Sequence, residues 1–408
     1  MFNKENLINK LLSSTWSFLL LLVAILILSG CASNPKAINP SQVGAEQTAE
    51  YFPLLKDKRI GVVVNQTSRV QNMHLVDLLT KHGFDVQTIF APEHGFRGDH
   101  SAGEKVKSSI DAATGINIES IYGKYKKPSK ALMSQLDIII FDIQDVGVRF
   151  YTYISSMHYM MQAAAENNVE FLVLDRPNPN IQYIDGPILE DKFRSFVGMH
   201  PIPLSHGMTV GEIAKMIVGQ GWLSIESKKV GFDYKLKLTV IPVKDYQRQD
   251  SYVLPVAPSP NLPNQQAINL YPSLCLFEAT PVSVGRGTDF PFQVLGHNNT
   301  FVGDFSFTPK PIKGVSKNPK LNGVLLTGQN LTQTDIKGFD LSLFFNWFQV
   351  FEQNKVEFFQ RPDFMDKLAG TDKLRKSMLA GQNLATIKQS WQADLTEFKQ
   401  QRKPYLLY

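Results

Sequence analysis

The sequence contains very little cysteine. Cys31 and Cys275 are the only two in 408 residues. If Cys31 is modified as described below, Cys275 has no disulfide partner, even in an oxidising compartment. Metal-binding patterns are missing too: H-E-x-x-H does not occur, and His94 and His100, six residues apart, do not have a standard ligand spacing. We therefore expect neither an intramolecular disulfide nor a required metal ion.

Nucleotide and nucleic-acid signatures are absent as well. The first expected strand leads into NQTSRV, at residues 65–70, instead of G-x-G-x-x-G, and no G-x-x-x-x-G-K-S/T occurs. The net charge is only +5, without the basic run that nucleic-acid binding requires. Ser283 lies in PVSVG, which lacks the first glycine of G-x-S-x-G. We expect no cofactor, no nucleic-acid partner and no serine-hydrolase chemistry.

The N-terminus has the pattern of a bacterial lipoprotein signal. Lys4 and Lys10 precede an apolar run from Phe18 to Leu28, which is too short to span a membrane. The run ends in LSGC, at residues 28–31, which resembles the lipobox after which the cysteine is diacylated. Paired acyl chains anchor a protein stably. We expect Cys31 to carry a lipid anchor; ordinary signal cleavage beside an incidental cysteine is the alternative.

The residues after Cys31 agree with a lipoprotein. Ala32 follows the cysteine, where an aspartate would favour retention at the inner membrane. We therefore expect a periplasmic lipoprotein, anchored in the outer membrane more readily than in the inner. Residues 1–30 are then the signal peptide. Residues 31–50 are small and polar with two prolines, which indicates a flexible tether.

From residue 51 the pattern becomes regular. Short apolar, β-branched runs are typical of fully buried parallel strands. Helical patterns lie between them, and alternating strands and helices predict an open α/β sheet with helices on both faces. The expected strands are RIGVVVN (59–65), DVQTIFAPE (85–93), DIIIFDI (137–143) and EFLVLDRP (170–177), and the expected helices lie within 73–83, 129–136 and 152–168.

Each expected strand ends in polar residues. In open α/β sheets, ligands bind outside the carboxyl ends of the strands, so four polar ends indicate one cleft. The candidates are Asn65 at the first strand, Glu93 and His94 at the second, Asp142, Asp145 and Arg149 at the third, and Asp175, Arg176 and Asn178 at the fourth.

A second polar region extends from Ala257 to Gly296. Its prolines and glycines favour a rigid loop over a long helix, and it carries Glu278, Arg286 and Asp289. We place the domain boundary near residue 265, which gives domains at 51–265 and 266–408. The later apolar positions have helical spacing and are expected to be core faces, namely those in 341–351 and Leu384, Ile387, Trp391, Leu395 and Phe398.

Seven ordered motifs resemble a known family. They are APEHGFRG, DIQDVGVRFYTY, LDRPNP, PLSHGMTVGE, PSPNLP, FEATPVSVGRGTDFPF and YLLY. Together, from about Arg59 to Tyr408, they are similar to the NamZ-type exo-β-N-acetylmuramidases. The resemblance implies a Rossmann-like, mostly parallel N-terminal sheet with a smaller α+β C-terminal domain. It also implies release of β-linked N-acetylmuramic acid from the non-reducing end of peptidoglycan fragments during cell-wall turnover.

Glycoside hydrolysis usually requires two carboxyl groups. Glu93 is our candidate for the general acid, because burial at the end of an apolar strand favours the protonated form. The resemblance also places a catalytic glutamate in the E-H-G motif. His94 would orient Glu93 or bind sugar hydroxyls, unless it is structural. Asp142 or Asp145 would orient the substrate's 2-acetamido group for attack on the anomeric carbon, or act as the nucleophile, unless they cap a helix or pair with arginine.

The lactyl carboxylate distinguishes muramic acid from glucosamine. A guanidinium group matches that planar anion and donates two charge-assisted hydrogen bonds. Arg149, Arg176 and Arg286 are the candidates, each with a structural ion pair as the alternative. Gly285 and Gly287 would let the backbone approach the ligand. Glu278, Asp175, Asn65 and Asn178 complete the expected binding set. The rival function is a non-catalytic lipoprotein that binds cell-wall fragments.

Overall fold

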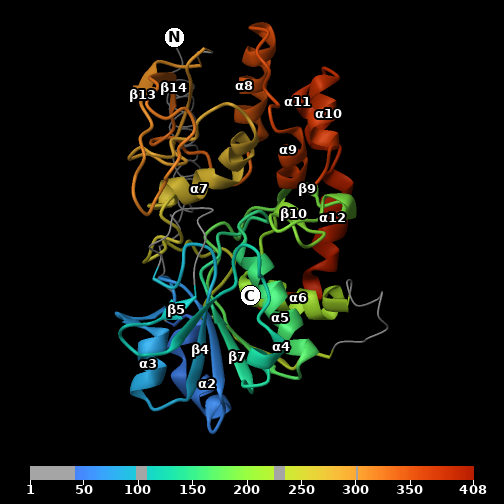
Figure 1. Ribbon diagram of the computed structural model, residues 1–408. Helices are drawn as coiled ribbons and strands as arrows, with labels where there is room; N and C mark the ends of the chain where they lie inside the picture. Colours follow the sequence, from blue (N-terminus) through green and yellow to red (C-terminus); the bar gives the residue numbers. More distant parts are fainter. Residues whose placement is uncertain (1–41, 98–107, 225–234, 300–301) are drawn as a thin grey trace, which may run out of the picture.

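A seven-stranded sheet forms the centre of the larger lobe (Figure 1). The computed structural model describes residues 42–97, 108–224, 235–299 and 302–408. All neighbouring strands are parallel except β5, which runs antiparallel to β6. In spatial order the strands are β11 (Leu238–Ile241), β8 (Glu170–Leu174), β7 (Ile138–Asp142), β1 (Ile60–Val64), β4 (Val86–Ala91), β6 (Asn117–Ser120) and β5 (Ser109–Ile110).

The strand order reverses at β1. The chain proceeds from β1 to β4 and β6 on one side, then returns to place β7, β8 and β11 on the other. This is the doubly wound arrangement, in which the crevice at the reversal is the usual ligand site. The expected Rossmann-like, mostly parallel sheet and its four expected strands are confirmed.

Helices cover both faces of the sheet, and every residue of β1 and β7 is therefore buried. On one face, α2 and α3 pack against the side chains of Val62 and Ile140. On the other, α5 and α6 pack against Val63 and Phe141. The helices of this lobe are α2 (Thr48–Leu55), α3 (Leu75–Lys81), α4 (Lys130–Met133), α5 (Tyr153–Glu166) and α6 (Val210–Gly219).

Residues 42–50, expected to belong to a tether, are instead packed against the sheet. Gln42 pairs with Lys244, and the Gly44 amide donates to the Asp175 carbonyl at 2.8 Å. A Cβ at Gly44 would lie 2.5 Å from the Asp175 nitrogen, so only glycine fits there. The tether prediction is wrong for this part, because backbone pairing and burial of Ala45 hold it in place. Residues 31–41 lie outside the described ranges.

The second lobe combines a small antiparallel sheet with helices. Its strands are β12 (Val294–His297), β14 (Leu326–Asn330) and β13 (Phe305–Phe307), in that order. Its helices are α7 (Gln265–Leu274), α8 (Leu341–Gln353), α9 (Pro362–Ala369), α10 (Lys373–Leu379), α11 (Leu384–Gln389) and α12 (Gln392–Gln401). Short elements elsewhere are β2 (Arg69–Val70), β3 (Met73–His74), β9 (Asp185–Ile188), β10 (Pro203–Ser205), η1 (Gly44–Glu46), η2 (Asp191–Phe193), η3 (Trp222–Ser224), η5 (Cys275–Ala279) and η6 (Lys403–Tyr405).

One expectation for this lobe fails and another holds. The region expected to be loop contains α7, because Asn264 caps the helix by accepting from the Ala267 amide at 2.9 Å. The apolar positions of α8 and the terminal helices are core, as expected. Trp391 is only 3% exposed, and its indole donates to Asp185 at 2.9 Å.

The two lobes share one hydrophobic core, which includes residues from Val63 of β1 to Phe398 of α12. The chain also ends against the first lobe, beside α5 and α6 (Figure 1). There the Tyr408 hydroxyl donates to Asp175 and accepts from the Val243 amide, both at 2.7 Å. The last residue of the chain is therefore fixed to the first lobe. Within the described ranges, no helix is long and apolar enough to cross a membrane.

Candidate active site

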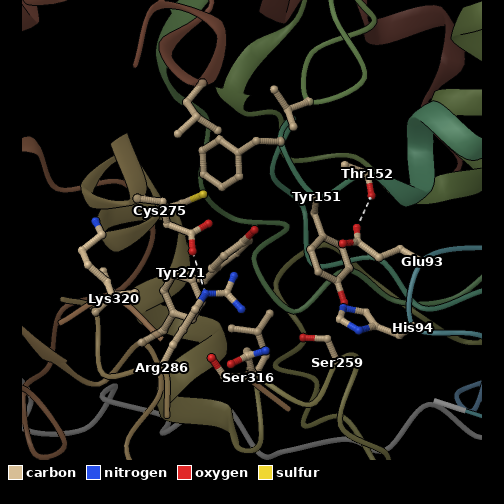
Figure 2. A pocket seen from close by; sticks show the side chains of 18 of the residues that line it. Glu93, His94, Tyr151, Thr152, Ser259, Tyr271, Cys275, Arg286, Ser316 and Lys320 are labelled. Carbon is tan, nitrogen blue, oxygen red and sulfur yellow. Dashed lines mark hydrogen bonds and ion pairs between the residues drawn. The ribbon is translucent and has the colours of Figure 1, made fainter. Parts of the chain in front are cut away.

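A cavity of about 800 Å³ lies between the carboxyl ends of β4 and β7 and the second lobe (Figure 2). Glu93 and His94 contribute from the turn after β4, and residues 150–153 contribute from the segment after β7. The second lobe supplies residues from the η5 region and from 315–320. The cavity thus occupies the place that the strand-end rule predicts.

Glu93 is held at the first-lobe wall by two hydroxyl groups. Tyr122 Oη donates to Glu93 Oε1 at 2.9 Å, and Thr152 Oγ1 donates to Oε2 at 3.1 Å. Burial and the adjacent Glu93 carboxylate raise the pKa of Tyr122, so its hydroxyl keeps its proton. The turn is tight, with φ +70° at His94 and +79° at Gly95. Hydroxyl groups both donate and accept, so these contacts suit either protonation state of Glu93.

Glu278 and Arg286 form the facing wall. Arg286 Nε lies 2.6 Å from Glu278 Oε1, and its guanidinium lies 4.9 Å from the centre of the Phe292 ring. Among the described residues, nothing hydrogen-bonds to the two terminal nitrogens, and Figure 2 shows the group directed into the cavity. The expectation that Glu278 and Arg286 share a cleft with Glu93 is confirmed.

The glycines beside Arg286 serve the fold of the loop. A Cβ at Gly285 would lie 2.5 Å from the Phe290 carbonyl oxygen, and one at Gly287 would lie 2.5 Å from that of Lys310. Both residues have positive φ, at +78° and +82°. The close approach that they permit is therefore to neighbouring backbone, and it orients the arginine between them.

Lys320 is a cavity residue that the sequence did not reveal. Its ammonium donates to the carbonyl oxygens of Phe277, Thr280 and Val282. Burial lowers the pKa of Lys320 to about 8. Because an ammonium has three N–H donors, these bonds occupy all of them, and Lys320 organises the chain around Glu278 instead of offering a free donor.

The enclosed part of the cavity is aromatic. Tyr151 and Tyr271 are 8% and 7% exposed, and their ring centres are 5.8 Å apart. Phe292 contacts Tyr271 edge-on at 4.8 Å between ring centres. Tyr151 lies in one of the quoted motifs, but its position in the lining depends on how the two lobes meet.

Asp142 and Arg176 were expected in the cleft but do not line it. They pair with each other beneath it, with 2.5 Å between Arg176 Nε and Asp142 Oδ1 and 2.9 Å between Arg176 Nη2 and Asp142 Oδ2. Asp142 is 0% exposed and Arg176 4%. The structural alternative holds for both, since a buried charge requires a partner.

Asp145 is also buried outside the lining. Its Oδ2 accepts from the Gly147 amide at 2.7 Å and lies 3.8 Å from His206 Nε2. Burial raises the pKa of Asp145 to about 7 and lowers that of His206 to about 3. Between about pH 3 and pH 7 the pair is therefore a contact between a protonated carboxyl group and a neutral imidazole.

Arg149 is likewise withdrawn from the cavity. It is 0% exposed and donates to the carbonyl oxygens of Pro187, Ile202 and Leu368. Burial lowers the pKa of Arg149 to about 9. Of the three candidate arginines, the structure brings only Arg286 to the cavity wall.

The remaining strand-end residues have local structural partners. Asp175 accepts from Thr209 and Tyr408, and Asn178 donates to the Met208 carbonyl. Asn65 accepts from Thr67. None of the three lines the cavity. Within the described part of the chain, no three His, Cys, Asp or Glu side chains are grouped as metal ligands, and His100 lies outside it.

The fold and the cavity define a two-lobed α/β protein with a doubly wound sheet and two glutamates, Glu93 and Glu278, in the lining between the lobes. The chain belongs to the NamZ exo-β-N-acetylmuramidase family. The family's N-terminal model matches residues 60–266, and its C-terminal model matches residues 269–408.

Individual relatives agree with this assignment. The peptidoglycan β-N-acetylmuramidase NamZ of Bacillus subtilis (strain 168) is 38% identical over 381 residues, covering 88% of this chain and 89% of that protein. A crystal structure of a DUF1343 family protein from Bacteroides fragilis NCTC 9343 matches with a TM-score of 0.80 and 47% identity. A second DUF1343 protein from the same organism matches at 0.77 and 26%. Each covers 90% of this chain and 98% of its own.

Asp145→Asn tests the structural role of Asp145. Because burial raises the pKa of Asp145 to about 7, the folded state retains a proton that the unfolded state loses near its ordinary value of about 4. Its stabilising contribution is therefore complete below about pH 4 and is lost as the pH rises through about 7. Unfolding by urea at several pH values should show this decline, and it should be smaller in the variant, which keeps the similar contribution of Asp175, whose pKa burial raises to about 6.

Activity provides the second measurement on the same variant. An asparagine resembles the protonated acid and can still accept from Gly147, so most of the activity should remain. If the Asp145→Asn protein were folded but inactive, Asp145 would have a catalytic role after all.

Proposed function

We propose that this protein is an exo-acting β-N-acetylmuramidase that releases terminal N-acetylmuramic acid from the non-reducing end of peptidoglycan fragments. The observation that carries the proposal is the pairing, across one cavity, of a hydroxyl-held glutamate and an arginine with free terminal donors. The first suits proton donation to a glycosidic oxygen, and the second suits a lactyl carboxylate. The activity named for the Bacillus relative agrees with it.

Glu93 acts as the general acid. It lies in the strand-end turn that faces the cavity, and the hydroxyls of Tyr122 and Thr152 fix the direction of its carboxyl group. A proton donor must be within hydrogen-bond reach of the leaving oxygen, so this fixed geometry matters more than flexibility. His94, in the same turn, lines the cavity beside Glu93 and has φ +70°.

The group that attacks the anomeric carbon belongs to the substrate or is Glu278. Asp142 and Asp145 are buried beneath the cavity, so neither reaches a sugar without rearrangement. The 2-acetamido group of muramic acid can attack the anomeric carbon itself, as in substrate-assisted glycosidases. Among the described residues, Glu278 is the other carboxyl group in the lining, and it is paired with Arg286.

Arg286 binds the lactyl carboxylate. Its Nε is engaged by Glu278, which leaves the two terminal nitrogens for a planar anion. Lys320 cannot take this part, because its three donors are already bound to carbonyl oxygens. Arg361 also lines the cavity, but it is exposed and lies over the Phe364 ring at 4.3 Å.

Glu93→Gln should separate two substrates. A sugar hydroxyl is a poor leaving group and needs a proton, whereas a nitrophenolate departs without one. The variant should lose about 10²–10⁴-fold on the natural disaccharide, the usual contribution of acid catalysis, and retain much of its activity on a nitrophenyl muraminide. Glu170→Gln, at a partly buried ion pair with Lys58 and Lys237 outside the cavity lining, is the matched control. Equal loss on both substrates in a folded protein would move the acid role to Glu278.

Arg286→Gln should change the choice of substrate. Losing a desolvated charge partner should weaken muraminide hydrolysis by on the order of 2–5 kcal/mol, while a glucosaminide, which lacks the lactyl group, should be affected far less. Arg361→Gln removes a second cavity arginine and should have little effect on the ratio. If Arg286→Gln reduced both activities equally, the arginine would have a structural or catalytic role.

The rival function is a lipoprotein that binds cell-wall fragments without cleaving them. The same cavity and the same arginine would serve both functions, and turnover distinguishes them. Hydrolysis of a nitrophenyl β-N-acetylmuraminide by the purified wild type supports the enzyme; binding of muramyl saccharides without turnover supports the rival.

We also propose that the protein is a periplasmic lipoprotein, anchored through acylated Cys31 and held at the outer membrane more readily than at the inner. The support is the LSGC motif behind a short apolar run. Cys31→Ala should release the protein into the soluble periplasmic fraction, which fractionation and immunoblotting would measure. Ser29→Ala, two residues earlier, serves as a control that keeps the cysteine. Full membrane association of Cys31→Ala would contradict the anchor.

A further inference from the structure

A small hairpin contributes two residues to the cavity lining. Ser195 and Gly198 exchange backbone hydrogen bonds of 2.9 and 3.0 Å, so Phe196 and Val197 form the tip. Both tip residues line the cavity. They lie outside every motif that suggested the function, and nothing in the mechanism described above uses them.

The Phe196 ring belongs to an aromatic group that includes a partner of Glu93. Its centre is 6.0 Å from that of Tyr122, whose hydroxyl donates to Glu93. Tyr159 is stacked on it, with 6.3 Å between centres and 23° between planes. Tyr159 therefore supports the Phe196 ring, which also lies next to Tyr122, the residue that holds Glu93.

A third contact of the Phe196 ring, with Lys126, is one that a ligand can displace. The Lys126 ammonium lies 5.2 Å from the ring centre, on a side chain that is only partly buried. A solvated lysine over a phenylalanine is a weak contact, and its long stem lets it move aside and donate to a bound hydroxyl group instead.

Other residues of the lining are more deeply buried than Phe196. Tyr271 and Phe292 are 7% and 1% exposed, beside Arg286. Phe196 is half-buried, and its neighbour in the group, Tyr122, is too. An exo-acting enzyme places the terminal sugar in the closed part and lets the rest of the chain leave through the open part, so Phe196 lies on the leaving-group side of Glu93.

We propose that Phe196 is the platform for the leaving N-acetylglucosamine, an inference that rests on the function proposed above. A β-linked glucosamine ring has all its substituents equatorial, so its axial C–H bonds form an apolar face with slight positive charge. That face complements the negative face of an aromatic ring. Phe196 thereby determines specificity for the leaving N-acetylglucosamine, while Arg286 recognises the terminal N-acetylmuramic acid.

Product inhibition tests this assignment directly. Hydrolysis of nitrophenyl muraminide is measured well below KM, with N-acetylglucosamine or free N-acetylmuramic acid as the inhibitor. In Phe196→Ala the inhibition constant for N-acetylglucosamine should rise about tenfold, as expected for a lost aromatic contact. Inhibition by N-acetylmuramic acid should be unchanged, because that sugar occupies the enclosed part.

Matched variants keep the test decisive. Phe196→Tyr retains the ring and should behave as wild type, and Phe196→Leu serves if the alanine variant does not fold. Phe193→Ala removes a nearby phenylalanine that does not line the cavity and should leave both inhibition constants unchanged. A wild type without activity would overturn the proposed function and the platform together. An active Phe196→Ala or Phe196→Leu protein with wild-type inhibition by N-acetylglucosamine would overturn the platform alone.

Discussion

The buried guanidinium of Arg149 is the constraint on which the arrangement of the two lobes depends. Within the described residues it has no carboxylate partner, and backbone carbonyls of Pro187, Ile202 and Leu368 solvate it instead. Pro187 is in β9 and Ile202 directly precedes β10, whereas Leu368 belongs to α9 of the second lobe. If the lobes separated, the guanidinium would lose some of these acceptors, and leaving a buried charge without hydrogen-bond partners is costly. The lobes therefore remain together around this cation.

The same residue connects the interlobe contact to the cavity. Arg149 directly precedes the segment that supplies Tyr151 and Thr152, the latter a partner of Glu93. A Cβ at Gly370 would lie 2.5 Å from Arg149 Nη2, so the end of α9 closes tightly over the guanidinium. Gly198, which ends the hairpin bearing Phe196, also lies beside it, with a hypothetical Cβ 3.7 Å from Nε. Packing around one cation thus connects the end of α9, the wall that supplies Thr152 and the hairpin.

Several ionisable groups near the strand ends stabilise the fold instead of contributing chemistry. Asp142 and Arg176 neutralise each other at the strand reversal, and Asp175 binds the last residue of the chain. Such pairs make the floor of the cavity stiff, because each buried charge or hydrogen-bonding group would lose its partner if the floor moved. The acid and the arginine belong to the cavity lining above this floor.

Much of the fold and part of the site could be predicted from the sequence. The β-branched runs of β1, β4, β7 and β8 determined the parallel sheet, since only a sheet buried on both faces suits them. Glu93, at the end of one of these strands, was placed correctly beside the cavity. Asp142 ends a neighbouring strand and looks equivalent in sequence, yet it is buried.

The difference between Glu93 and Asp142 lies in what covers them. Arg176, from the next strand, covers Asp142, whereas the turn after β4 directs Glu93 towards the second lobe. Lys320 and Phe196 reach the cavity from segments without any motif, because distant parts of the chain meet there. Local sequence patterns determine which segments become strands and where their polar ends lie. Only the tertiary structure decided which of those ends stay open to a ligand, because burial and pairing depend on residues far away in the chain.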